Sequence, residues 1–445
     1  MPRHVLIIGA GTGGLALAHA LRKSASDITF AVYERDRTRT DGLFGYRVGI
    51  SPEGSRCLAA CLPPDLFDVF KSTTAIPPDS FNMITEQYHE LLSIDGFSKE
   101  SEDGVAGERS VSRMTLRQVL LTGLEDSVYF DKHFTHYTSN GDGTVTAFFK
   151  DGTSASGDLL VGADGSGSPV RQQFLPQAKL KESGLYGITA KVELNAETKA
   201  FLPPKALRGV TMVNAPRGDS CIIHVMEFPW DHDGKPKGSI GSSDEQLLRN
   251  WPGLTFDNTR DYILLGFGSH GSRLPEDFMS MDGPSLHKLL LDRIATWHPD
   301  FRKLFDMSEA STSFPINIRT SERMEPWEST NVALLGDAIH TMTPGLGVGA
   351  NTALLDAKIL AESLVSKSDI SSAVAMYESE MHSYAWKRVE KSLERFNAND
   401  AVYKPGLVGA LATMVQRGGM RLVNSIPPLK SRVASEMTKE RGNTD

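Results

Sequence analysis

A glycine-rich turn between an apolar strand and a helix, at the start of the chain, restricts the fold more than any other feature. Residues 4–8 read HVLII, which is typical of a buried parallel strand, and residues 15–21 have the pattern of a helix. Between them, Gly9, Gly11 and Gly14 give the spacing G-x-G-x-x-G. We expect Gly9 to make a tight turn, Gly11 to let the backbone approach a pyrophosphate, and Gly14 to let the helix pack on the strand.

Glu34 ends a second apolar strand, 28–33, and lies 25 residues after Gly9. This is near the offset of the carboxylate that binds a ribose in dinucleotide-binding folds. A lone G-x-G-x-x-G is weak evidence. Here strand, turn, helix, second strand and terminal acid occur in order, so the segment predicts a dinucleotide site in a doubly wound α/β unit.

A second glycine-rich loop lies at 331–356, which reads NVALLGDAIHTMTPGLGVGANTALLD. An apolar strand, 332–335, precedes Gly336 and Asp337, and a new helix begins near Ala350. Glycines let the backbone approach a flat ligand, and the N-terminus of a helix favours negative charge. Asp337 is placed to accept hydrogen bonds from a polyol. Two such elements so far apart predict one long cofactor that is held at both ends.

A third motif follows the strand 159–161 in the stretch DLLVGADGSGSPVR. Asp164 stands in its Asp-Gly turn, and Arg171 stands where a helix begins. Taken alone, the stretch is equally well explained as a structural turn. Together with the other two motifs, it predicts a third contact with the same cofactor.

These motifs resemble those of the single-component FAD-dependent aromatic hydroxylases, the para-hydroxybenzoate hydroxylase type, and the resemblance covers nearly the whole chain. GAGTGGLALAHAL with VYER is similar to the FAD-ADP motif of that family, GADGSGSPVR to its Asp-Gly motif, and GDAIHTMTPGLGVGANTALLDA to its Gly-Asp motif. Arg113 in SRMTLRQVLL resembles a flavin-contacting arginine. The sequences of these motifs are most similar to those of fungal members that modify secondary metabolites. Their arrangement along the chain is similar to that of tetracycline-inactivating flavin monooxygenases.

The resemblance implies a non-covalent FAD, with NADPH or NADH as reductant and O2 as co-substrate. It implies a monooxygenase that inserts one oxygen atom into an aromatic or polycyclic small molecule through a flavin C4a-hydroperoxide. Pro344 begins the loop expected against the pyrimidine end of the flavin. The residues expected to bind FAD are Gly9, Gly11, Gly14, Glu34, Arg35, Arg113, Asp164, Asp337, Gly347, Gly349, Ala350 and Asn351.

Three further residues are candidates for the catalytic, substrate-facing side. Thr189 in GITAKVEL and His224 in IIHVMEF lie on runs that resemble substrate-contacting strands, and Arg47 in GYRVGIS lies near the position of a nicotinamide-enzyme arginine in that family. His224 would hydrogen-bond or deprotonate a phenol, or it is a packed histidine. Arg47 would meet a substrate oxygen or the flavin edge, or it is a surface arginine. His340 is expected to be a structural hydrogen-bonding residue.

We predict an α/β fold in which a Rossmann-like FAD-binding domain is interleaved with an antiparallel β-sheet substrate domain and followed by C-terminal helices. The FAD-binding domain is assigned to 1–80, 113–172 and 286–372, the substrate domain to 81–112 and 173–285, and the helical segment to 373–445.

Composition excludes some partners and leaves others open. A net charge of −8 disfavours nucleic acid. Cys57, Cys61 and Cys221 are expected in the core, without a metal site, and indicate a reducing, cytoplasmic setting. The apolar run 406–415 is too short to span a bilayer. It is interpreted as a packed helix, with weak association with a membrane surface or a cap over the mouth of the substrate site as the alternatives.

Two alternative activities remain open on this reading. One is a redox-silent flavoprotein whose pocket shapes a cyclisation, and the other is a flavin oxidase or dehydrogenase on the same scaffold. The motifs do not distinguish NADH from NADPH and do not name the substrate.

Overall fold

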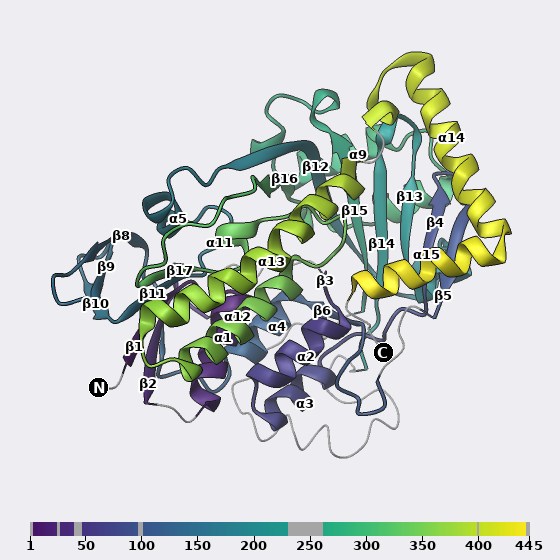
Figure 1. Cartoon of the computed structure of the whole chain (residues 1–445). Helices are drawn as coiled ribbons and strands as arrows, with labels where there is room; N and C mark the ends of the chain where they lie inside the picture. Colours follow the sequence, from purple (N-terminus) through teal and green to yellow (C-terminus); the bar gives the residue numbers. More distant parts are fainter. Residues whose placement is uncertain are drawn as a thin grey trace.

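A computed structural model describes residues 3–24, 27–39, 47–96, 101–229, 261–397 and 400–441. The chain has the predicted mixed α/β architecture, with two main sheets at different ends of the molecule (Figure 1). None of the helices in the part that the structure describes is long and apolar enough to cross a membrane.

The first sheet has five parallel strands in the order β17-β11-β1-β2-β7. They are β17 (Val332–Leu334), β11 (Leu159–Gly162), β1 (Arg3–Ile8), β2 (Ile28–Tyr33) and β7 (Val128–Tyr129). Ile8 pairs with Tyr33 and with Gly162, and Gly162 pairs with Leu334. The carboxyl ends of four strands therefore meet at one edge, where ligands bind in open α/β sheets. The motifs around Gly9, Glu34, Asp164 and Asp337 all follow these ends.

Helix α1 (Thr12–Lys23) packs on β1 and β2 of this sheet, and α13 (Ile370–Asn397) packs on β17. Further helices pack on these two or on each other: α2 (Pro52–Cys61), α3 (Pro64–Ser72), α4 (Arg113–Leu121) and α12 (Gly349–Ser366). Helix α1 packs closely because Gly14 lies against the turn at Gly9: a Cβ on Gly14 would stand 2.2 Å from the Gly9 carbonyl oxygen. Gly9 itself has a φ of +109°, and a Cβ there would stand 2.4 Å from the Ala163 oxygen. Packing within the protein therefore requires both glycines.

The second sheet has seven strands in the order β16-β12-β15-β14-β13-β4-β5. They are β16 (Pro315–Ser321), β12 (Leu180–Glu193), β15 (Tyr262–His270), β14 (Ser220–Met226), β13 (Gly209–Asn214), β4 (Ser80–Thr85) and β5 (Glu90–Asp95). Neighbouring strands are antiparallel except β13 and β4, which are parallel. The runs that the sequence predicted as an antiparallel sheet are β12, β13, β14 and β15, and these strands are antiparallel to their neighbours among them. Strand β4 adds a parallel neighbour to β13.

The domain boundaries themselves stay a prediction, and the sheets divide the chain differently at two places. Strand β16 lies within 286–372 but borders the second sheet, and β6 (Arg109–Ser112) pairs with β3 (Arg47–Ile50) in a separate two-stranded sheet. A three-stranded sheet of β8 (Phe134–Ser139), β9 (Val145–Phe149) and β10 (Ser154–Gly157) stands beside the first sheet, at the left of Figure 1.

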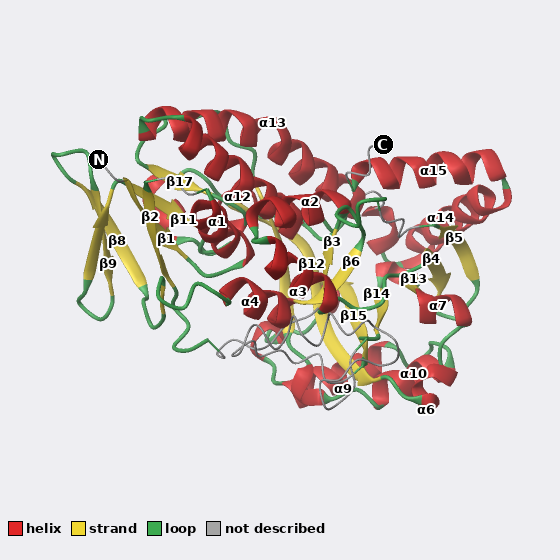
Figure 2. Ribbon diagram, turned by 90° about the horizontal axis from the view of Figure 1, so that it is seen from below, coloured by secondary structure: helices red, strands yellow, loops and turns green. Residues whose placement is uncertain are grey.

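The two faces of the second sheet have different neighbours. Helices α9 (Gly283–Arg293) and α10 (Pro299–Asp306) cover one face and form a core with Ile188, Ala190, Ile223 and Val225. Side chains alternate along a strand, so the residues between these point to the opposite face. Figure 2 shows β3 and β6 on the side away from α9 and α10. Short helices α5 (Pro169–Phe174), α6 (Ala196–Ala200), α7 (Pro204–Arg208) and α11 (Asp337–His340) complete the connections.

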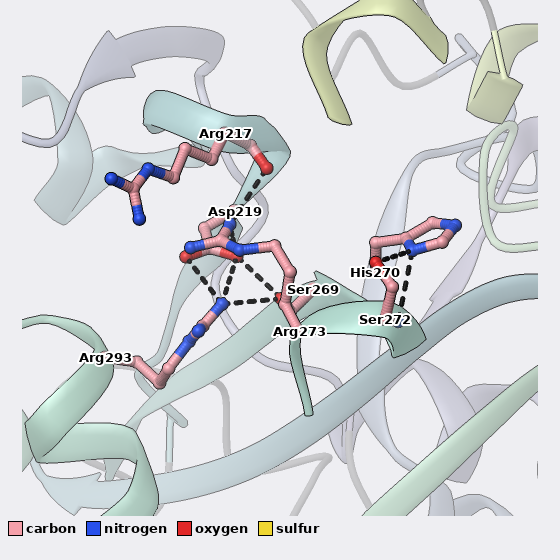
Figure 3. Close-up of polar contacts among 7 residues, drawn as sticks. All are labelled: Arg217, Asp219, Ser269, His270, Ser272, Arg273 and Arg293. Carbon is pink, nitrogen blue, oxygen red and sulfur yellow. Dashed lines mark hydrogen bonds and ion pairs between the residues drawn. The ribbon is translucent and has the colours of Figure 1, made fainter. Parts of the chain in front are cut away.

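A buried carboxylate fixes one end of the second sheet (Figure 3). Asp219, in the turn between β13 and β14, accepts hydrogen bonds from Arg273 at 2.7 Å, from Arg293 at 3.2 Å and from the Ser269 hydroxyl at 2.7 Å. A buried carboxylate is stable only with such partners. The cluster therefore attaches the turn to β15 and α9.

The chain ends in two helices, α14 (Gly406–Ser425) and α15 (Pro427–Glu440). Helix α14 packs against β5 at the outer edge of the second sheet, and α15 returns from it toward the first sheet (Figure 1).

Candidate cofactor and substrate site

The N-terminus of α1 is open at the place where a pyrophosphate was expected. Gly11 is the N-cap residue, with extended backbone angles of φ −85° and ψ −177° and no side-chain cap. A Cβ on Gly11 would meet only the Ala163 oxygen, at 4.0 Å. The first turn of α1 contains no acidic residue. Its N–H groups and positive dipole end therefore suit an anion, and Gly11, unlike Gly9 and Gly14, is not required by packing.

Glu34 is buried beside this turn. Its carboxylate accepts hydrogen bonds from the main-chain N–H of Ala10 at 2.7 Å and of Asp36 at 3.0 Å. Arg117 on α4 lies 3.7 Å from Glu34 and 3.0 Å from Asp36, and its Nε donates to the Ala10 oxygen at 3.2 Å. The carboxylate thus holds the turn, and its contact with a ribose stays a prediction. Arg35 next to it is exposed.

Arg117 was missed by reasoning from the motifs. It stands one helical turn after Arg113, on the same side of α4, and this spacing was the available signal.

Asp164 carries an oxygen that lacks a protein partner. Its Oδ2 accepts from the Val170 N–H at 3.3 Å, while its buried Oδ1 has no hydrogen bond among the described residues. Desolvation raises the pKa of the Asp164 carboxyl. A buried unpaired carboxylate oxygen is unfavourable, so a ligand hydroxyl at this position would satisfy it. The open Gly11 and this oxygen fit a dinucleotide lying along the strand ends.

Asp337 is exposed at the end of β17, yet desolvation by the surrounding protein raises the pKa of its carboxyl. Arg113 is among the groups that lower this pKa in opposition, which places the two side chains near each other. Arg113 is exposed at the start of α4. The charge of Arg113 thus acts on Asp337, and the motifs assigned both residues to the flavin.

Buried Asp356 supports the turn that carries Asp337. Its carboxylate accepts from the Gly336 N–H at 2.7 Å and from the Tyr384 hydroxyl at 2.5 Å, and it lies 2.6 Å from His340 Nε2. Burial disfavours a charged His340 ring, but the Asp356 carboxylate outweighs this and raises the pKa of His340. His340 thus has the structural hydrogen bond expected of it.

The Asn351 side chain supports the loop after Pro344 through hydrogen bonds. The Asn351 side chain is buried; it accepts from the Ser51 N–H at 2.9 Å and donates to the carbonyls of Gly49 at 3.0 Å and Gly347 at 3.3 Å. These bonds occupy the amide, so a flavin contact from this residue would come from its main chain.

Other residues of this loop and the start of α12 remain accessible to a ligand. Pro344 and Gly347 are exposed, and Gly347 has a φ of +64°. Gly349 and Ala350 begin α12, which has no side-chain cap and no acidic residue in its first turn. The N–H groups there are suited to negative charge on a ligand.

A second support of this loop comes from the end of α15 and leaves no motif in the sequence. Arg441 donates from Nε to buried Glu108 at 2.7 Å and from Nη1 to the Leu346 carbonyl at 3.1 Å. The preceding Glu440 pairs with Lys391 at 2.6 Å and with Arg395 on α13. Only the tertiary structure brings the chain end to the loop.

Thr189 and His224 share the face of the second sheet that is turned away from α9 and α10. Their neighbours along each strand point into the helix-covered core, and Thr189 is aligned through Gly266 with Ile222, next to His224 on that face. Both side chains are buried. Thr189 Oγ1 donates a long hydrogen bond, 3.5 Å, to the Thr312 carbonyl.

His224 is an unusual buried histidine because neither ring nitrogen has a hydrogen-bond partner among the described residues. Burial and, secondly, the charge of Arg47 lower its pKa well below the ordinary value. The Arg47 guanidinium donates to the Ser110 hydroxyl at 3.1 and 3.0 Å, and burial lowers its pKa to about 10. The charge of Arg47, on β3, thus acts on His224, on β14 of the second sheet. Within the described residues, no cluster of three or more His, Cys, Asp or Glu side chains could hold a metal ion.

Comparison with known proteins finds similar proteins that are named as FAD-binding or FAD-dependent. A sequence model of the FAD-binding domain family matches residues 304–392. The dual O-methyltransferase/FAD-dependent monooxygenase CTB3 of Cercospora beticola is 34% identical over 407 residues, which are 88% of this chain and 45% of that protein. The chain thus spans less than half the length of this relative.

Two further proteins are similar over most of their own length. The FAD-dependent urate hydroxylase of Klebsiella pneumoniae is 29% identical over 84% of this chain and 85% of that protein. The crystal structure of Klebsiella pneumoniae HpxO complexed with FAD and uric acid has a TM-score of 0.74 at 24% identity and covers 99% of this chain and 96% of that chain. It has the same fold as this chain.

Proposed function

We propose that this chain is an FAD-dependent monooxygenase that uses NAD(P)H and O2 to insert one oxygen atom into an aromatic or polycyclic small molecule, a secondary metabolite. The observation that carries the proposal is the common edge of four parallel strands. Gly11, Asp164 and Asp337 follow the ends of β1, β11 and β17 there, and His224 lies on β14 of the second sheet.

Different residues at this edge would contact different parts of the cofactor. The N–H groups after Gly11 would hold the pyrophosphate, and Glu34 the ribose of the adenosine half. Asp337 would bind the ribityl chain. The start of α12 would face the pyrimidine end, where its N–H groups stabilise negative charge. When bound and reduced, FAD supplies the reaction with O2 that yields the oxygen donor.

His224 is the residue that we expect to contact the substrate. Its lowered pKa keeps the ring neutral, so it is a weak base and acts mainly as a hydrogen-bond donor and acceptor. Two unpartnered ring nitrogens in a buried site are unfavourable, and a phenolic or carbonyl oxygen of the substrate would satisfy one of them. Arg47 would attract the oxygen of an ionised phenol. Thr189 would form part of the same face of the second sheet and contact the substrate there.

The test is turnover of the FAD-loaded protein under 18O2 with a panel of polycyclic phenols. We expect NAD(P)H consumption and one labelled oxygen atom in the product. Hydrogen peroxide without labelled product would favour an oxidase or dehydrogenase, and a transformed substrate without NAD(P)H oxidation would favour the redox-silent alternative.

Because no described segment forms a separate nicotinamide domain, the reductant must reach the flavin from outside. We expect the glycine-rich loop 345–349 to let the flavin shift toward the surface, with substrate binding favouring that shift. Anaerobic stopped-flow reduction should then be much faster with substrate than without it. Equal rates would remove this form of control but not the monooxygenase assignment.

A further inference from the structure

Helix α14 packs on its own domain with its polar side. The only α14 residues that are buried are Gly409 and Thr413. Three long polar side chains on the same side make hydrogen bonds or ion pairs with the second sheet: Gln416 with Asn214 at 2.9 Å, Arg417 with Glu86, and Asn424 with Glu90 at 2.9 Å. Asn424 also accepts from the Ser93 N–H, at 3.2 Å. The attachment of this helix is therefore polar.

The apolar side of α14 faces solvent. We define the α14 stripe as Leu407, Val408, Leu411, Met414, Val415 and Leu422, whose exposed fractions are 88%, 56%, 58%, 65%, 65% and 58%. Their spacing places them on one face of a helix, opposite Gly409 and Thr413. Single exposed apolar residues are ordinary, but a continuous stripe along a helix marks an interaction surface. The helix expected over 406–415 is thus present, but its polar side packs on the protein and its apolar side faces solvent.

The charge of this region is also unlike that of the rest of the protein. The chain carries a net charge of −8, yet residues 401–435 contain no Asp or Glu. Their cations are Lys404, Arg417, Arg421, Lys430 and Arg432. Arg421 is exposed, and its position on the helix wheel is at the edge of the stripe. Apolar residues with cations beside them are typical of helices that lie in the surface of an anionic bilayer.

We propose that the α14 stripe docks on an anionic phospholipid surface, with α14 lying in the plane of the headgroups. A second copy of this chain fits less well: its own stripe would bring the same acid-free segment, 401–435, and so no negative charge to meet Arg421. Lipid headgroups bring the opposite charge, and the acyl boundary accepts the apolar side chains. The proposal does not depend on which reaction the site catalyses.

The test is flotation of the FAD-loaded protein with vesicles of phosphatidylcholine alone or with phosphatidylserine added. We expect association with the anionic vesicles that weakens as salt is raised. Arg421→Gln should lower the partition coefficient about fivefold, from roughly 1 kcal/mol per cation near such a surface. Leu411→Gln with Met414→Gln should lower it on the order of tenfold for each side chain. These positions are exposed, so FAD content and turnover on a water-dissolved substrate should not change.

Met279→Gln is the matched control, because Met279 is 47% exposed but lies on a different part of the protein. It should float like the unchanged chain. Absence of binding to anionic vesicles, or binding that the Leu411/Met414 change does not weaken, would overturn the proposal. So would a dimer in light scattering that this double change converts to monomers, because a second copy would then cover the stripe. If the double variant fails to fold, Arg421→Gln and the salt series still decide.

Discussion

Replacement of Gly11 by Val should remove FAD without weakening the fold. A Cβ at this position has only one neighbour, the Ala163 oxygen at 4.0 Å, and the backbone angles are extended, which a β-branched residue tolerates. Loss of Gly from an N-cap position is unfavourable by about 1 kcal/mol. The smaller conformational freedom of the unfolded chain offsets this by about 0.4–1 kcal/mol. The free energy of unfolding of the flavin-free protein should therefore change little.

The effect on cofactor binding should be large. The added side chain occupies the approach to the N–H groups at the start of α1. Each hydrogen bond to a charged phosphate contributes about 1.5–3 kcal/mol, so one lost bond weakens FAD binding on the order of 10- to 100-fold. The assay is titration of deflavinated protein with FAD, followed by flavin fluorescence, together with thermal unfolding of the flavin-free form.

Gly14→Ala is the control, since its Cβ would stand 2.2 Å from the Gly9 oxygen. It should lower the melting temperature of the flavin-free protein, whereas Gly11→Val should not. If Gly11→Val binds FAD as tightly as the unchanged chain, the pyrophosphate does not lie at this turn. A large loss of stability in Gly11→Val would show instead that the glycine serves the fold.

Four further outcomes are expected. Asp337→Ala should lower flavin content with the circular dichroism spectrum unchanged, and full flavin content would contradict its role at the ribityl chain. His224→Gln should lower turnover on the order of 10²-fold or more with FAD retained, and unchanged turnover would make it a packing residue. Arg441→Gln removes the ion pair with buried Glu108, and it should slow turnover more than Arg441→Lys does at equal flavin content. Equal rates for the two variants would show that Arg441 does not position the loop. Burial lowers the pKa of His19 to about 4, so His19 binds a proton in the unfolded chain at a higher pH than in the folded protein. The free energy of unfolding should therefore fall by about 3 kcal/mol as the pH drops from 6.5 to 4. In His19→Gln, urea unfolding should show a smaller dependence of this free energy on pH over that range.

Local patterns in the sequence were sufficient for the cofactor edge. Each predicted strand is apolar, each ends in a glycine turn or an acid, and parallel strands place such ends together. The residues that support these turns were not accessible in the same way. The spacing of Arg117 from Arg113 places it on the same side of α4, but its contacts with Glu34, Asp36 and Ala10 depend on how α4 packs in the fold. The hydrogen bonds of Asn351 join residues 300 or more positions apart, with Ser51 and Gly49.

The sequence alone determined the fold class and the FAD-type motifs, because these depend on periodicity and on glycine positions within single strand–turn–helix units. It also indicated a helix over the apolar run 406–415. Only the tertiary structure decided which side of α14 is inside, since the polar partners Glu86, Glu90 and Asn214 belong to distant strands. It likewise decided that Arg441 reaches Glu108 and the cofactor loop. Contacts between residues far apart in the chain leave no period or spacing in the sequence, so folding itself has to bring them together.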